Sequence, residues 1–169
     1  MALDSSSVVL QVAGSQSSSI DFTTGTAPLS RTYQLLYGTG TGANNADRIW
    51  HDQRTLTASS SEDLDLAGTL VDVFGATVTF ARIRAIVIAA AAGNTNNVIV
   101  GNATSNGFNT WVGGATHTVT VRPGGFLCVA NTDATAYAVT AGTGDLLHVA
   151  NSGAGTSVTY DVILLGVSA

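Results

Sequence analysis

The sequence predicts an all-β protein: an antiparallel, jelly-roll-like β-sandwich with an extended N-terminal arm. One observation is the spacing of about eight to ten short apolar runs, which turn-forming residues interrupt roughly every 8 to 12 positions, as in sandwiches and barrels. A second is strand length, because long first and last strands can pair side by side in one sheet, as in jelly rolls. The chain length of 169 residues favours one domain and is sufficient to bury a core.

The first 30 residues differ from the rest of the chain. They hold one short apolar run, from Val8 to Val12, among serine, threonine and glycine, and this is too little to form a core. We therefore expect residues 1–30 to be an arm that adds a strand to its own sheet or to that of a neighbour, and residues 31–169 to be a single sandwich domain. Val8, Val9 and Leu10 are the candidate partner contacts of this arm.

The first strands of the body are predicted at residues 33–37 and 49–58. In the second of these, alternation places four side chains on one face: Trp50, Asp52, Arg54 and Leu56. The glycine-rich residues 38–45 form a loop between the two strands, and residues 59–63 are predicted to be a turn.

The centre of the chain, residues 77–99, predicts a β-hairpin: a long apolar strand, a Gly93-Asn94 turn and a second apolar strand. The continuous apolar run over residues 86–92 indicates a strand buried on both faces, because a strand covered on one face would alternate. A helix over residues 85–92 is the alternative, since alanine is the best helix former.

Two arginines interrupt the alternation of this central strand. Arg82 and Arg84 fall on the same face as Val78 and Phe80 if the strand is regular. Either a β-bulge near Ala81 reverses the alternation, or both arginines face a partner, and a buried arginine would need an acid nearby. Both arginines are therefore candidate partner contacts.

Further strands follow the centre. They are expected at residues 116–121, 126–130, 137–140, 146–150 and 157–167, and residues 108–112 are expected to form either a short strand or an aromatic loop. Turn formers separate them, such as Arg122-Pro123-Gly124-Gly125, in which proline and glycine occupy favoured turn positions.

The charge composition indicates a surface that is built from Thr, Ser, Asn, Gly and Ala, or one that other protein largely covers. Charged residues are 10% of the chain, against about 25% in ordinary soluble domains, which suits an assembly subunit better than a free monomer. The net charge is −5 and all six basic residues are arginine. We expect no nucleic-acid partner, because phosphate binding requires positive charge. Arginine suits bidentate contacts at protein interfaces, although codon bias explains the same composition. No apolar run approaches the roughly 18 residues of a membrane helix, so no membrane partner is expected.

No residue pattern nominates a catalytic, metal or cofactor site, and we expect none. His51, His117 and His148 are not at metal-ligand spacing, and the single cysteine, Cys128, cannot complete a zinc site. His51 and Asp52 point to opposite faces of one strand, which excludes the contact that a catalytic triad needs by spacing alone. The acids at positions 62, 63 and 65 are interpreted as a solvated turn, because the glycine and acidic spacing of a calcium-binding EF-hand loop is missing.

The two tryptophans, Trp50 and Trp111, are the remaining candidates. Core packing is the first interpretation, an interface the second and a carbohydrate platform the third. They complete the set of candidate partner contacts: Val8, Val9, Leu10, Trp50, Arg82, Arg84 and Trp111.

Four segments carry a family resemblance: DLAGTLVDVFGATVTF, VRPGG, AYAVTAGTGDLL and TYDVILLGVSA. In these segments the chain resembles small virion proteins of tailed bacteriophages, and most of all head decoration, or cement, proteins. The resemblance covers most of residues 46–169 and rests on strands and turns. It therefore implies a fold and a setting but carries over no catalytic residues.

The resemblance implies a non-enzymatic protein of the outer capsid surface that binds the major capsid protein, associates with itself as a homotrimer and stabilises the head. The alternative is a tail or head-fibre component that binds a host receptor glycan, with Trp111 and the loop at residues 102–107 as candidate contacts. A small glycan-active enzyme is the third hypothesis, and no pair of carboxylates in the sequence supports it.

Overall fold

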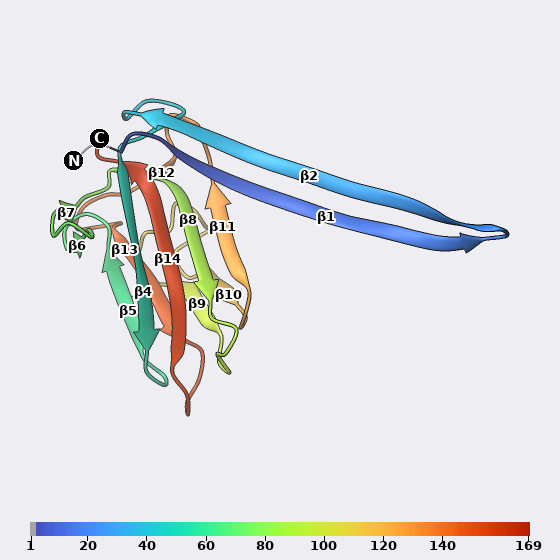
Figure 1. Cartoon of the computed structure of the whole chain (residues 1–169). Helices are drawn as coiled ribbons and strands as arrows, with labels where there is room; N and C mark the ends of the chain where they lie inside the picture. The colour runs from blue at the N-terminus through green and yellow to red at the C-terminus, as the bar shows by residue number, and fades with distance from the viewer. Residues whose placement is uncertain (1–2) are drawn as a thin grey trace.

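The computed structural model describes residues 3–169, and its regular structure is entirely β (Figure 1). These residues contain no helix, and hence none that could cross a membrane. The strands are β1 (Ser6–Ile20), β2 (Thr23–Thr39), β3 (Asn45–Ala46), β4 (Arg48–Leu56), β5 (Ser61–Asp65), β6 (Leu70–Val71), β7 (Thr77–Val78), β8 (Arg82–Ala90), β9 (Val98–Gly101), β10 (Thr118–Val121), β11 (Phe126–Ala130), β12 (Tyr137–Ala138), β13 (Leu146–Asn151) and β14 (Val158–Val167).

Two antiparallel sheets pack face to face and form the body. One has the strand order β11-β8-β14-β4, with β12 as a further partner of β8, and the other has the order β10-β9-β13-β5. Alternating apolar residues from both sheets fill the space between them; on β14 these are Val158, Tyr160, Val162 and Leu164. The predicted all-β class and antiparallel sandwich are confirmed.

The predicted central hairpin is wrong, because its two strands lie in different sheets. β8 pairs with β11 and β14, whereas β9 pairs with β10 and β13. Residues 91–97 form a connection long enough to cross from one sheet to the other, whereas a two-residue turn would have held the strands together. The central strand is also not buried on both faces by the core, since Val87 and Ala89 are half-buried on the outer side.

The turn predicted at residues 59–63 is too long, because β5 begins at Ser61. Leu64 of β5 enters the core and pairs with Leu147 of β13. β5 is an edge strand, and such a strand accepts charged residues that a central strand would not.

A β-bulge at Arg84 reverses the alternation of β8. Leu165 of β14 lies opposite Ala85 and Gly166 lies opposite Ile83, so that Arg84 is the extra residue. Ile83 and Ile86 are both buried in the core although three positions separate them. The reversal predicted near Ala81 therefore occurs three residues later.

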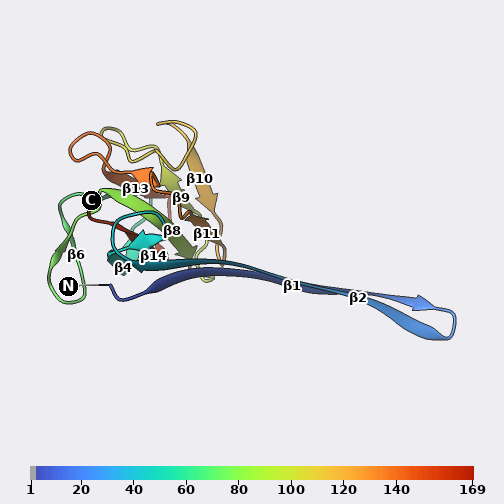
Figure 2. The same cartoon turned by 90° about the horizontal axis from the view of Figure 1, so that it is seen from above.

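The N-terminal segment forms a long hairpin that projects from the body (Figures 1 and 2). β1 and β2 pair without interruption from Ser6 opposite Tyr37 to Ile20 opposite Thr23. Residues 31–39, which are predicted to lie in the body, instead belong to β2 of this arm. The N-terminal strand β1 thus pairs with the next segment of the chain, β2, and not with a strand of the two body sheets.

A small apolar cluster and several hydrogen bonds attach the arm to the body. Tyr37 is buried with Ala46, Ala85 and Leu165, and its hydroxyl donates to the Asn131 carbonyl oxygen over 2.9 Å. β2 also pairs in parallel with the short strand β3. These contacts hold the base of the arm across one end of the β11-β8-β14-β4 sheet.

Candidate interaction surface

The arm is amphipathic. The register places Val8 with Leu35, Leu10 with Tyr33, and Gly14 with Leu29 on one side of the hairpin. We call this side, which also carries Val12, Ile20 and Arg31, the apolar arm face. Beyond the base it is uncovered: Leu29 is 53% exposed and Tyr33 is 65% exposed. Apart from Val9 and Leu36, the opposite side carries mainly serine, threonine and glutamine.

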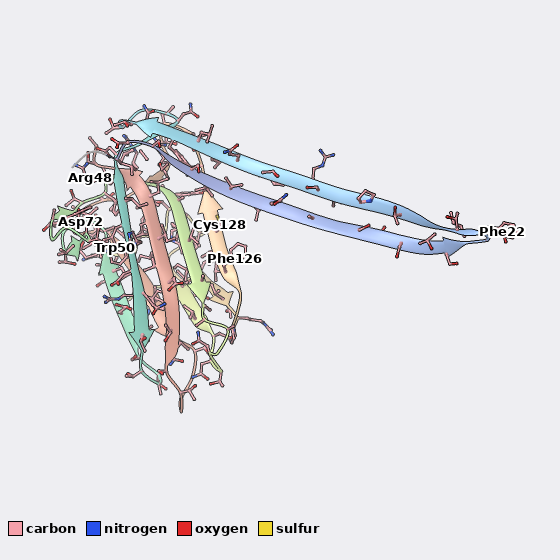
Figure 3. All side chains as sticks on the ribbon, viewed as in Figure 1. Phe22, Arg48, Trp50, Asp72, Phe126 and Cys128 are labelled. Carbon is pink, nitrogen blue, oxygen red and sulfur yellow. The ribbon has the colours of Figure 1, made fainter. Side chains whose placement is uncertain are left out.

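A second uncovered apolar surface lies on the outside of the β11-β8-β14-β4 sheet, which faces the viewer in Figure 1. We call it the outer sheet face, and the register arranges it in rows across the strands. One row holds Ala130, Ala85, Leu165 and Ile49; the next holds Cys128, Val87, Ile163 and His51; the third holds Phe126, Ala89, Asp161 and Gln53. Phe126 is 62% exposed, and its side chain and that of Cys128 project from β11 in Figure 3.

These two surfaces meet at the base of the arm. Val8 and Leu35 pack against the cluster that contains Ala85 and Leu165. Beside this contact is a hollow of about 480 Å³, lined by residues 6–11 of β1 and by residues of β4, β8, β11 and β14. The apolar arm face is therefore already matched to the outer sheet face within one chain, and both continue uncovered beyond the contact.

The structure separates the predicted partner contacts into two groups. Val9 and Leu10 are exposed on the arm, and Val8 and Arg82 are half-buried near its base. Trp50, Arg84 and Trp111 are buried inside the body and present no surface to a partner. Alternation alone did not reveal the outer residues Phe126 and Ile163, because either face of a strand can be the buried one.

Both tryptophans belong to the core, which confirms the first interpretation. The Trp50 indole N–H donates to the Val71 carbonyl oxygen over 3.0 Å, and that of Trp111 donates to the Phe108 carbonyl oxygen over 3.0 Å. A buried tryptophan needs such a partner for its single donor. Trp111 is thus not available as an exposed aromatic platform for a glycan.

Arg84 is fully buried and is held by backbone carbonyl groups. Its guanidinium donates to Asn45 O over 3.0 Å, to Gly42 O over 2.7 Å, and to Asp133 O. Burial lowers the pKa of Arg84. The predicted acid near a buried arginine is Asp133, whose charge interacts with that of Arg84. The hydrogen-bond acceptors, however, are backbone carbonyl oxygens of β3 and of two loops.

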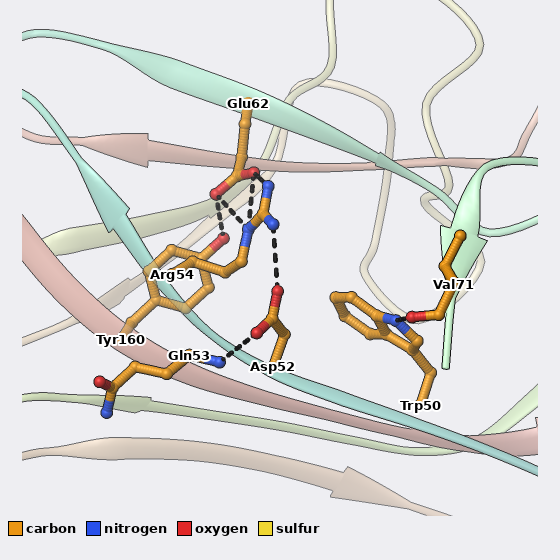
Figure 4. Close-up of polar contacts among 7 residues, drawn as sticks. All are labelled: Trp50, Asp52, Gln53, Arg54, Glu62, Val71 and Tyr160. Atoms are coloured by element: carbon orange, nitrogen blue, oxygen red, sulfur yellow. Dashed lines mark hydrogen bonds and ion pairs between the residues drawn. The ribbon is translucent and has the colours of Figure 1, made fainter. Parts of the chain in front are cut away.

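A polar cluster joins the two sheets at one edge of the sandwich (Figure 4). Arg54 of β4 donates to Glu62 of β5, with Nε to Oε2 at 3.0 Å, and to Asp52 Oδ2 over 3.1 Å. The Tyr160 hydroxyl of β14 donates to Glu62 Oε1 over 2.8 Å. The hydrogen bond to Glu62 raises the pKa of Arg54. One guanidinium bonds to both carboxylates, and the bonds to Glu62 link β5 of one sheet to β4 and β14 of the other.

The acids that could have formed a calcium site are each engaged separately. Glu62 binds Arg54, Asp63 lies 2.6 Å from His148 Nδ1, and Asp65 accepts from the Ala67 N–H over 2.9 Å. Within residues 3–169 no group of three or more His, Cys, Asp or Glu side chains is placed to hold a metal ion.

We expect the folded protein to lose stability above about pH 10 because two tyrosines are buried. Burial raises the pKa of Tyr37 to about 12 and raises that of Tyr160 further. A tyrosine pKa raised by folding stabilises the folded state fully below the unfolded value of about 10, and this stabilisation is lost as pH rises through the folded value. Urea unfolding at several pH values should show a smaller alkaline decline for Tyr37→Phe than for the wild type. Parallel declines would contradict the prediction.

Comparison of the chain with protein-family models, with curated proteins and with solved structures gave no match.

Proposed function

We propose that this protein is a non-enzymatic structural subunit of a tailed-bacteriophage virion, a decoration protein that binds the outer lattice of the major capsid protein and stabilises the head. The observation that carries the proposal is the arm. Its strands of 15 and 17 residues are exposed along nearly their whole length. An isolated two-stranded hairpin is only marginally stable in water, so such an arm gains its stability by lying on a neighbour.

The composition of the arm supports this role. Residues 6–39 hold only two charged side chains, Asp21 and Arg31. Phe22 stands at the tip and is 98% exposed (Figure 3). Exposed aromatic side chains are the anchors that most often carry binding energy at protein interfaces. The arm is therefore suited to contact protein and not solvent.

The family resemblance of the body supplies the setting. The strand order also supports a jelly roll, since β4 and β14, the first and last strands of the two body sheets, pair with each other, and the chain passes between the sheets several times. On a capsid, an arm that reaches from one subunit to the next ties two lattice positions together and resists outward pressure on the shell. Self-association as a homotrimer follows the same resemblance.

The test uses phage particles that lack the protein. Purified protein should bind these particles and raise the temperature at which they release DNA. An equal release temperature with and without the protein would contradict the proposal.

Phe22→Ser should weaken particle binding about tenfold or more. It should change the free energy of unfolding by less than about 0.5 kcal/mol, because the side chain is exposed. Phe74→Ser is the matched control, since Phe74 is 72% exposed on the body, and it should bind like the wild type.

A further inference from the structure

We propose that the apolar arm face of one copy packs on the outer sheet face of a second copy. This inference rests on the proposed function as an assembly subunit, and it names the surfaces through which the protein associates with itself. The occupant of the outer sheet face is residues 6–39 of another molecule.

The first argument is continuity with a contact that exists within the chain. At the base of the arm, Val8 and Leu35 already pack on the cluster of Ala85 and Leu165. The next residues on the arm, Leu10 and Tyr33, repeat the same chemistry but are exposed. The next row of the sheet, with Val87, Cys128 and Ile163, is likewise only partly covered. A second arm laid beside the first would extend an apolar contact that the fold has already formed.

The second argument is size. The arm extends 12 residues from Val8 to Ile20, which is about 40 Å at the rise of a strand. Four strands spaced about 4.8 Å apart make a face roughly 15 Å wide, so the arm can cross the whole sheet of a neighbour. Beyond its base the arm does not lie on its own sheet, because it leaves the body past β11 (Figures 1 and 2).

The third argument is charge complementarity. Arg31 is the only charged residue of the apolar arm face, opposite Val12. Asp161 is the only charged residue of the outer sheet face, between Ala89 and Gln53. Among the described residues neither forms an ion pair, and the Asp161 carboxylate accepts only from Gln53 Nε2 over 2.9 Å. One lone charge of opposite sign on each of these two surfaces would fix the orientation of the contact.

A second copy satisfies these requirements completely, because every copy offers one arm and one sheet face. Reciprocal exchange between two copies, or a ring in which each arm lies on the next sheet, leaves neither surface uncovered.

The charge pair is tested by sedimentation equilibrium of the full chain. The wild type should associate, and Arg31→Asp or Asp161→Arg should each raise the dissociation constant about tenfold or more. The double variant Arg31→Asp/Asp161→Arg should restore association, whereas the control Arg122→Asp should not change it. A wild type that stays monomeric at about 100 μM, or single variants that associate like the wild type, would overturn the inference, as would a double variant without rescue.

The single native cysteine allows a direct test, because Cys128 lies on the outer sheet face. Leu29→Cys places a thiol on the apolar arm face, about 20 Å along the arm from Val8 and away from Cys128 of the same chain. Mild oxidation should link the introduced thiol to Cys128 of another molecule. Ser30→Cys, on the opposite side of the arm, is the control and should link far less; equal linkage would overturn the inference.

These outcomes are separable from those of the proposed function. A protein that is monomeric in solution but decorates particles contradicts only the inference. A protein that exchanges arms but does not bind particles contradicts only the proposed function.

Discussion

Replacing Arg84 with methionine is expected to lower the free energy of unfolding by about 4 kcal/mol, because several buried carbonyl groups lose their donor at once. The Arg84 guanidinium bonds to carbonyl oxygens of Asn45, Gly42 and Asp133. The methionine side chain has no hydrogen-bond donor. Because Arg84 is 0% exposed, water cannot reach these carbonyl groups in place of the guanidinium without rearrangement of the protein.

Two further variants separate burial from charge. Arg84→Lys keeps the charge but not the planar fork of donors, and it should lose an intermediate amount of stability. Arg122→Met is the control, since Arg122 is exposed and its loss should cost less than about 0.5 kcal/mol. Urea unfolding gives the free energy of unfolding of all three variants. An Arg84→Met protein as stable as Arg122→Met would show that the carbonyl contacts contribute nothing to stability.

Replacing Gly166 with alanine is expected to lower the free energy of unfolding by about 3 kcal/mol, because a side chain there has no space. A Cβ atom at this position would lie 2.4 Å from Arg82 O and 2.7 Å from Phe80 Cδ1. Neither neighbour can move freely, since the first is backbone of β8 and the second is a core side chain that is 3% exposed.

Gly14→Ala is the matched control for this prediction, because it changes another strand glycine with no atom within 4 Å of the added group. It should be neutral or slightly stabilising, since alanine restricts the unfolded chain more than glycine does. Thermal unfolding of the two variants gives the comparison. Equal melting temperatures would mean that β8 and β14 can separate at the bulge without cost.

Gly166 of β14 and Arg84 of β8 belong to the same β-bulge. The bulge at Arg84 shifts the register between Leu165 and Gly166 and turns the guanidinium away from the core toward the loops at the base of the arm. The absence of a side chain at Gly166 lets β14 approach β8 at this point. The arm is thus anchored by a local irregularity of the sheet.

The strands of the body could be predicted from the sequence because alternation is a local property. Trp50 and Leu56 on β4, and the alternating core residues of β14, show the period of two within a few neighbouring positions. The interpretation of both tryptophans as core residues followed from the same pattern. The low charge indicated an uncharged surface, and the polar N-terminal segment with its single short apolar run indicated an arm.

The amino-acid sequence by itself thus determined the all-β class, the positions of most strands and the uncharged surface. Only the tertiary structure decided that β8 and β9 lie in different sheets and that Arg84 is buried among carbonyl groups. It also decided that the apolar arm face and the outer sheet face are both uncovered. The physical reason is the separation of the interacting residues along the chain. Alternation depends on adjacent residues, whereas strand partners and the acceptors of a buried charge come from distant segments.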